Sequence, residues 1–315
     1  MTKRKKIFLT ITGIIISLLV IVGVAFGVKL YLDNRIKFEI NDTLPDGNGK
    51  KARVILLAGQ SNASGCSSDE YLKKKVSENK YAEYSNGYSN VYINYFASDN
   101  NRSSGFVKTT VCQGEIGGYF GPELGIAEKL SEQYPNELFF VIKYAWGATD
   151  LFNLWLSPSS DGEIGQLYNA FVKYVETSLE YLHDKNYDIQ IEGMCWMQGE
   201  SDSFTVENAT NYEEHLSNFI KDIRNEFSDY SSVDGIAFID AYIADNPMYW
   251  VYCDMVNESK KAVSEYSELN VVIDTNAEGL TCSEEPEETP DMAHYDSLSQ
   301  IKLGHLFAER LIQFF

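Results

Sequence analysis

The sequence predicts an α/β fold, a three-layer α/β/α sandwich with a central parallel sheet, and three observations support this. An apolar run at residues 54–57 ends at Gly59, which is typical of a parallel-sheet strand buried on both faces. Further apolar runs follow along the chain, and stretches with helical periodicity separate most of them. Strands that alternate with helices form a parallel sheet covered on both faces by right-handed crossovers.

The expected elements follow in chain order. After the first strand, residues 68–90 are polar and rich in tyrosine, which predicts a helix and a loop. Pro122 and Glu123 mark a helix start, because proline suits the first helical position and an acid suits the first turn. The other expected helices are 164–182, 211–227, 255–266 and 297–312. The other expected strands are 91–96, 138–144, 189–197, 235–241 and 270–274.

The beginning of the chain differs in composition from the rest. A basic cluster at residues 3–6 precedes residues 7–28, which carry no charge and would form about 33 Å of helix at about 1.5 Å per residue. This length crosses a bilayer, and the basic side is expected to stay in the cytoplasm. A cleavable signal peptide is the alternative, but Ala25-Phe26-Gly27 is a poor match to a cleavage site.

We therefore expect a single-pass protein of the cell membrane in four parts. Residues 1–6 are the cytoplasmic basic end, and residues 7–28 are the transmembrane helix that attaches the protein to the membrane. Residues 33–51 are polar and show no periodicity, so they are expected to form a linker. Residues 52–315 are expected to form one extracellular domain with a large core.

The composition argues against several function classes. The 315 residues carry a formal net charge of −20 at pH 7, so no nucleic-acid partner is expected, because binding phosphates requires positive charge. The four histidines are scattered and no His or Cys pair has ligand spacing, so no metal ion is expected. The glycine cluster at residues 114–121 lacks the pattern of a nucleotide-binding loop.

Ser61 stands where an α/β enzyme usually carries out its chemistry, just after the carboxyl end of a buried strand. A nucleophilic serine needs a base, and His294 is the histidine predicted to lie in a loop rather than on a helix. Asp291, three residues ahead, could hold one imidazole nitrogen while the other faces Ser61. The alternatives are that Ser61 and Asn62 cap a helix, that Asp291 is a helix N-cap and that His294 is a surface residue.

Two further segments could supply hydrogen-bond donors to an oxyanion. The backbone N–H of Gly121 precedes a helix start, where N–H groups point outward and favour negative charge. The amide of Gln198 follows another buried strand and could also donate. A turn-stabilising amide is the alternative for Gln198.

Five short segments occur in one order along residues 54–315. They are Gly59-Gln60-Ser61-Asn62, Phe120-Gly121-Pro122-Glu123-Leu124, Lys143-Tyr144-Ala145-Trp146-Gly147-Ala148-Thr149, Trp196-Met197-Gln198-Gly199-Glu200-Ser201-Asp202 and Asp291-Met292-Ala293-His294. With these segments the chain resembles the SGNH hydrolase superfamily and, more narrowly, its sialate O-acetylesterase-like branch, carbohydrate esterase family six. The resemblance implies an SGNH/flavodoxin-like sandwich.

The resemblance also implies an activity, the removal of acetyl groups from sugar hydroxyls without a cofactor. Ser61 is then the nucleophile, His294 the general base and later acid, and Asp291 its orienting carboxylate. The backbone N–H groups of Ser61 and Gly121 and the side chain of Gln198 form the implied oxyanion hole. The substrate is an acetylated carbohydrate, expected here to be extracellular glycan.

Other residues of the matching segments are candidate substrate contacts: Gln60, Asn62, Trp146, Thr149 and Glu200. The chain departs from the family pattern at Ala63, where many members carry Met, and at Ala148, which replaces a frequent second Gly. Both departures bear on which substrate is bound rather than on the reaction that is expected. Two other functions stay open, a non-catalytic glycan-binding surface domain and a short-chain lipase or thioesterase of the same superfamily.

Overall fold

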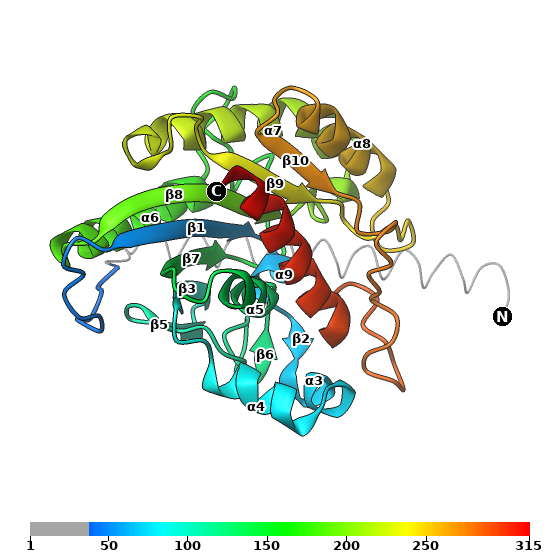
Figure 1. Cartoon of the computed structure of the whole chain (residues 1–315). Helices are drawn as coiled ribbons and strands as arrows, with labels where there is room; N and C mark the ends of the chain where they lie inside the picture. Colours follow the sequence, from blue (N-terminus) through cyan, green and yellow to red (C-terminus); the bar gives the residue numbers. More distant parts are fainter. Residues whose placement is uncertain (1–37) are drawn as a thin grey trace, which may run out of the picture. The chain divides into compact units, whose positions relative to one another are not determined.

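A mainly parallel sheet forms the centre of residues 38–315, the part of the chain that the computed structural model describes (Figure 1). The strands are β1 Lys51–Gly59, β2 Ser67–Ser68, β3 Val91–Ser98, β4 Asn101–Arg102, β5 Val107–Lys108, β6 Tyr119–Phe120, β7 Phe139–Ala145, β8 Asp188–Met197, β9 Ala237–Ala241 and β10 Asn270–Ile273. The eight-stranded sheet runs β10-β9-β8-β1-β7-β3-β4, with β5 also paired to β3. All its pairings are parallel except those of β4 and β5 with β3.

Helices cover both faces of the sheet. They are α2 Ser61–Ser64, α3 Asp69–Lys75, α4 Glu78–Asn86, α5 Glu123–Gln133, α6 Gln166–Asp184, α7 Val206–Glu226, α8 Cys253–Ser264 and α9 Ser297–Leu311. The side chains of consecutive strand residues point to opposite faces of a sheet. Lys143 and Tyr144, which are neighbours on β7, therefore show which helix covers each face. Lys143 pairs with Glu123 of α5, whereas the ring of Tyr144 lies 5.5 Å from that of Tyr174 on α6. Helices α5 and α9 therefore cover one face, and α6, α7 and α8 cover the other (Figure 1).

Two glycines let α5 and α9 cross at close range. A Cβ atom at Gly125 would lie 2.2 Å from the carbonyl oxygen of Ile301, and one at Gly304 would lie 2.2 Å from that of Pro122. No larger residue fits at either position without separating the helices. This contact fixes α9, which begins just after the loop that carries His294.

The register of the central strands places three turns at one edge of the sheet. Gly59 of β1 aligns with Ala145 of β7 on one side and with Met197 of β8 on the other. The turns that follow these residues therefore lie next to each other at the carboxyl ends of parallel strands, where ligands bind in open α/β sheets. The predicted α/β fold with a mainly parallel sheet is confirmed.

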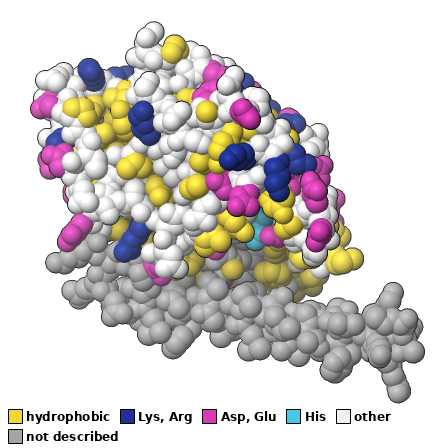
Figure 2. Space-filling view, turned by 90° about the horizontal axis from the view of Figure 1, so that it is seen from below, with side chains coloured by type: hydrophobic (Ala, Val, Ile, Leu, Met, Phe, Trp, Pro, Cys, Tyr) yellow, Lys and Arg dark blue, Asp and Glu magenta, His cyan; other side chains and the backbone are white. Residues whose placement is uncertain are grey.

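Several details differ from the expectation. Residues 68–90 contain two helices, α3 and α4, rather than one. The short strands β2, β4, β5 and β6 were not expected, because a two-residue strand has no period that a sequence pattern can reveal. On the face in Figure 2, Lys and Arg side chains lie scattered among Asp and Glu rather than gathered into one basic patch.

The expected linker is corrected over residues 38–50, because these residues pack on the sheet and its helices. The ring of Phe38 lies 4.9 Å from that of Tyr174, and Leu44 is buried. The backbone N–H groups of Thr43 and Leu44 both donate to the hydroxyl of Tyr181 at 3.0 Å. The packed unit thus begins at Phe38 rather than at residue 52.

The expected basic end at residues 1–6 and transmembrane helix at residues 7–28 lie outside the described residues. Within residues 38–315, no helix combines the length and the apolar character needed to cross a membrane.

A buried carboxylate joins three helices on the α5–α9 face. Glu128 of α5 accepts hydrogen bonds from Lys80 Nζ and the Tyr84 hydroxyl of α4, both at 2.6 Å. It is also 2.8 Å from His305 Nε2 of α9. Burial alone would raise the pKa of Glu128, but the hydrogen bonds from His305, Lys80 and Tyr84 outweigh it and lower the pKa to about 2.

We predict that Glu128→Gln lowers the free energy of unfolding at pH 7 by about 1.5–3 kcal/mol, because charge-assisted hydrogen bonds are lost. A carboxylate with a lowered folded-state pKa stabilises the protein above its ordinary pKa of 4.5, and this contribution is lost as pH falls toward 2. Urea unfolding from pH 7 to pH 2 should therefore show a smaller acid-induced loss in the variant. Glu132→Gln, on the exposed side of the same helix, is the control. Equal stability of wild type and Glu128→Gln at pH 7 would contradict the prediction.

Candidate active site

Ser61 lies in a tight turn between β1 and the short helix α2. Gly59 at the end of β1 has a φ of 137°, and a Cβ atom there would lie 2.0 Å from the carbonyl oxygen of Met197, so only glycine fits. Gln60 occupies the N-cap of α2 without a side-chain cap, and Ser61 is the first helical residue. Neither Ser61 nor Asn62 caps the helix, which removes the capping alternative for both.

Asp291 and His294 form a hydrogen-bonded pair in the loop before α9. The His294 Nδ1 and Asp291 Oδ2 atoms are 2.9 Å apart, and the N–H of Ala293 donates to Asp291 Oδ1 at 3.1 Å. Asp296, not Asp291, occupies the N-cap of α9. Because Asp291 holds Nδ1, the second imidazole nitrogen, Nε2, is left for another partner.

The electrostatic surroundings favour the charged imidazole. Burial would lower the pKa of His294, but the hydrogen bond and charge of Asp291, with the charges of Glu200 and Glu115, outweigh burial and raise the pKa. Burial likewise works against the carboxylate of Asp291, whose pKa is nevertheless lowered by the hydrogen bond and charge of His294. The two shifts have opposite directions, as expected for a coupled acid and base.

The structure brings the turn after β1 and the His294 loop together. The side chain of Asn62 accepts from the backbone N–H of Tyr295 at 3.1 Å and donates to the carbonyl oxygen of Ala293 at 3.3 Å. These two peptide groups lie on either side of His294. Ser61 is next to Asn62 in the chain, and His294 lies between Ala293 and Tyr295. The hydrogen bonds of Asn62 with these two residues therefore connect the segments that carry Ser61 and His294.

Two of the three expected oxyanion donors already have protein acceptors. The N–H of Gly121 donates to Glu123 Oε1 at 2.8 Å. The amide nitrogen of Gln198 lies 2.6 Å from Asp202 Oδ2 and 2.9 Å from the carbonyl oxygen of Thr149. The Gln198 side chain is also fully buried, and its amide links the turns after β7 and β8. The N–H of Ser61, in contrast, has no acceptor within residues 38–315.

Four of the five candidate substrate contacts are buried, and they form hydrogen bonds that connect the turns around the site. They are Gln60, Asn62, Thr149 and Glu200. The side-chain oxygen of Gln60 accepts from the N–H groups of Gly199 and Ser201, for example. The expected role of these four residues as substrate contacts stays a prediction. Trp146 is half-buried, and its ring stacks on Phe96 at 5.6 Å.

Two acidic residues of the site were missed by the sequence analysis. The Glu115 carboxylate accepts from Ser64 Oγ at 2.9 Å and from Cys66 Sγ at 3.3 Å, and its charge acts on His294. It lies in the glycine cluster at residues 114–121, where only backbone N–H groups had been considered. Burial, followed by the charges of Glu115 and Asp291, raises the pKa of the Cys66 thiol.

Asp202 is the second missed residue, and it anchors the turn after β7. Its buried carboxylate accepts from the N–H groups of Leu151 and Phe152 and from the amide of Gln198. Burial and the charge of Asp150 raise its pKa to about 8, and the donated hydrogen bonds limit the rise. The sequence feature that could have identified Asp202 is its position four residues after Gln198, in the segment Gln-Gly-Glu-Ser-Asp.

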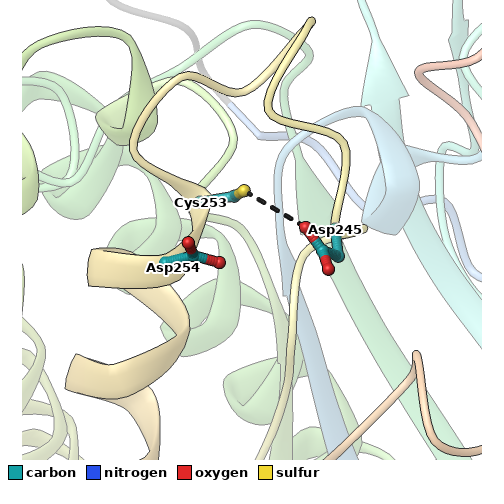
Figure 3. A group of neighbouring side chains, drawn as sticks. All are labelled: Asp245, Cys253 and Asp254. Atoms are coloured by element: carbon teal, nitrogen blue, oxygen red, sulfur yellow. Dashed lines mark hydrogen bonds between the residues drawn. The ribbon is translucent and has the colours of Figure 1, made fainter.

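One group of described side chains could supply three metal ligands, Asp245, Cys253 and Asp254 (Figure 3). The thiol of Cys253 points toward Asp245 and donates to its Oδ1 at 3.8 Å. Burial and the charges of Asp254 and Asp245 raise the pKa of this thiol, so it stays protonated at neutral pH. A bound metal ion would have to displace this thiol proton, because the thiolate is the ligating form. The eight-residue separation of Asp245 and Cys253 matches none of the metal-ligand spacings sought in the sequence.

The fold and this site together define a class, α/β hydrolytic enzymes with their site at the carboxyl edge of a parallel sheet. The family profile described as "Carbohydrate esterase, sialic acid-specific acetylesterase" matches residues 51–313. The chain belongs to this family and is a carboxylic ester hydrolase. No curated protein sequence matches the chain.

Three solved structures show the same fold at low sequence identity. A protein from Arabidopsis thaliana is 20% identical, with a TM-score of 0.59 over 86% of this chain and 99% of that one. NanS is 14% identical, with a TM-score of 0.61 over 86% of this chain and 99% of that one. A carbohydrate acetylesterase from Xanthomonas citri is 15% identical, with a TM-score of 0.51 over 83% of this chain and 56% of that one.

We predict that Asp291→Asn lowers the pKa of His294, because the neutral amide no longer stabilises the imidazolium. The His294 imidazole signals, followed by NMR from pH 4 to pH 9, should then titrate at more acidic pH than in wild type. Asp184→Asn, in the exposed pair with His183, should leave the His294 titration unchanged. An unchanged or more alkaline titration in Asp291→Asn would disprove the electrostatic role of this carboxylate.

Proposed function

We propose that the chain is a serine esterase that removes O-acetyl groups from carbohydrate, with Ser61 as nucleophile, His294 as general base and then acid, and Asp291 as orienting carboxylate. The observation that carries this proposal is the Asp291–His294 hydrogen bond at 2.9 Å, in a loop hydrogen-bonded to the residue after Ser61. Membership of a carbohydrate esterase family supports the reaction class.

In the proposed reaction, Nε2 of His294 takes the proton of Ser61 Oγ as this oxygen attacks the acetyl carbonyl. Asp291 holds Nδ1 and stabilises the imidazolium that forms. The N–H of Ser61, at the start of α2, faces the developing oxyanion. His294 then gives the proton to the departing sugar oxygen, and the C–O bond to the sugar breaks. Water, activated by His294, hydrolyses the acetyl-enzyme and releases acetate.

The proposal extends to the location of the enzyme. Residues 7–28 anchor the chain in the cell membrane, and the residues that follow act on extracellular glycan. The support is the uncharged length of residues 7–28 and the basic cluster on their amino side.

We predict that Ser61→Ala and His294→Ala each lower acetate release by at least about 10³-fold, because each removes one partner of the proton transfer. The substrates are p-nitrophenyl acetate and a panel of acetylated xylan, acetylated sialic acid and acetylated bacterial surface polysaccharide. Far-UV circular dichroism and the thermal midpoint check that both variants are folded.

Two exposed residues provide matched controls for these variants. Ser85→Ala and His183→Ala should retain wild-type acetate release, since both side chains lie on the outer surface of helices. Turnover close to wild type in Ser61→Ala or His294→Ala refutes the assignment. Glycan binding without acetate release by the wild type would instead indicate the non-catalytic binding domain.

We predict that the full chain stays in the membrane fraction after a carbonate wash and that protease added to intact cells digests residues 38–315. The double variant Ile14→Arg/Leu18→Arg should leave the membrane fraction, because each buried charge costs about 2.5–3.5 kcal/mol on insertion scales. The intact mass distinguishes an uncleaved anchor from a signal peptide. Release of the wild type by carbonate, or a mass lacking the first residues, would contradict the anchor.

A further inference from the structure

We propose that Asn62 and Glu200 are positioning residues of the esterase, and that Glu200 acts through Asn62 to hold His294 in register with Ser61. This inference rests on the proposed function, because it assigns the alignment of the proposed base with the proposed nucleophile. Neither residue is proposed to touch the substrate.

Every polar group of the Asn62 side chain forms a hydrogen bond, and two of its partners flank His294. Its oxygen accepts from the N–H of Tyr295 at 3.1 Å, and its nitrogen donates to the Ala293 carbonyl at 3.3 Å and to Glu200 Oε1 at 2.8 Å. The backbone of Asn62 is held as well, since Gln300 Nε2 donates to its carbonyl oxygen at 2.7 Å. The residue therefore fixes the His294 loop from both sides against the helix that begins with Ser61.

The backbone N–H groups of Asp291 and Met292 bond away from the turn after β1, whereas one peptide beyond His294 the carbonyl oxygen of Tyr295 accepts from Ser67 Oγ at 2.6 Å. The N–H of Asp291 donates to Glu285, and the N–H of Met292 donates to Cys282, both within the same C-terminal segment. These bonds shape the loop but do not set its distance from Ser61. Among the contacts described, the side chain of Asn62 connects the two peptide groups around His294 to the turn after β1.

The contact with Glu200 sets the orientation of the Asn62 amide. Glu200 is 1% exposed, and its Oε1 accepts the hydrogen bond from Asn62 Nδ2 at 2.8 Å. Burial raises the pKa of the Glu200 carboxyl, and the hydrogen bond from Asn62 and the charge of Lys260 oppose that rise. With the NH₂ group of Asn62 facing Glu200, its amide oxygen faces the N–H of Tyr295. With the amide flipped, two oxygens would face each other at Glu200 and two N–H donors at Tyr295. Buried mismatches of this kind are costly, so the orientation is fixed.

The charge of Glu200 also acts on His294. The acidic groups that act on the imidazole are Asp291 from its own loop, Glu200 from the turn after β8, and Glu115 from the glycine-rich loop. The other oxygen of Glu200, Oε2, is buried without a hydrogen-bond partner in the described part of the chain. Glu200 thus both orients Asn62 and adds negative charge near the base.

The test exchanges donor and acceptor between the two residues. Asn62→Asp places two acceptors opposite each other, and kcat for p-nitrophenyl acetate should fall about 100-fold with little change in KM, since misplacing a catalytic group by about 1 Å costs that much. In Asn62→Asp/Glu200→Gln, the Gln amide can donate to the Asp carboxylate, so kcat should recover at least tenfold over the single variant.

Two substitutions of Glu200 separate its hydrogen bond from its charge. Glu200→Gln can still accept from Asn62 and should keep kcat within about threefold of wild type, while the acid limb of its pH–rate profile moves to lower pH because one negative charge near His294 is lost. Glu200→Leu has a similar volume but no acceptor, and its kcat should fall as in Asn62→Asp. The comparison of Glu200→Gln with Glu200→Leu tests the positioning role of Glu200 even if Asn62→Asp does not fold.

Asn90 offers a matched control at the other end of the sheet. Its buried amide also bridges two carbonyl oxygens and a hydroxyl, those of Tyr134, Glu137 and Ser131. Asn90→Asp should lower the thermal midpoint without lowering kcat. If an active wild type shows unchanged kcat in Asn62→Asp, or no recovery in the double variant, this inference is overturned while the proposed function stands. A wild type without esterase activity overturns the proposed function, and this inference with it.

Discussion

The hydrogen bonds of Asn62 with the start of α9 and the loop before it are the contact on which the site depends. They join residues that are 231, 233 and 238 positions apart in the chain, and a buried Asn makes all three. An amide can donate and accept at once, so one residue can bind a carbonyl and an N–H of the same loop. The proposed nucleophile, Ser61, and the proposed base, His294, come from opposite ends of the domain, and Asn62 connects their two segments.

Buried ion pairs support the floor of the site on both faces of the sheet. Lys143 and Glu123 pair at 2.7 Å on the α5 face, and Lys260 and Asp240 pair at 2.6 Å on the α8 face. Burial lowers the pKa of Lys143 despite its partner, and burial raises that of Asp240 to about 6. Taking charges out of water is expensive, so such pairs add little net stability but penalise any arrangement that separates them.

The fold and the acid–base pair were predictable from sequence because each rests on a local pattern. Apolar runs of strand length mark the central strands, and the three-residue spacing of Asp291 and His294 is sufficient for the observed hydrogen bond. The orientation of a buried amide, in contrast, depends on residues far away in the sequence, so no local pattern predicts it. Gln198 turns inward because Asp202 and Thr149 accept its protons, and Thr149 follows a different strand. Residues 38–50 pack on the domain through single contacts, such as Phe38 with Tyr174, that leave no periodic signal.

The contact between Cys66 and Glu115 has a consequence for the chemical durability of the enzyme. The thiolate is the form that reacts with peroxides and alkylating agents, and the surroundings of Cys66 suppress it. A thiol five positions from Ser61 is therefore held in its less reactive, protonated form. Reagents that need a thiolate should therefore react slowly with Cys66 at neutral pH.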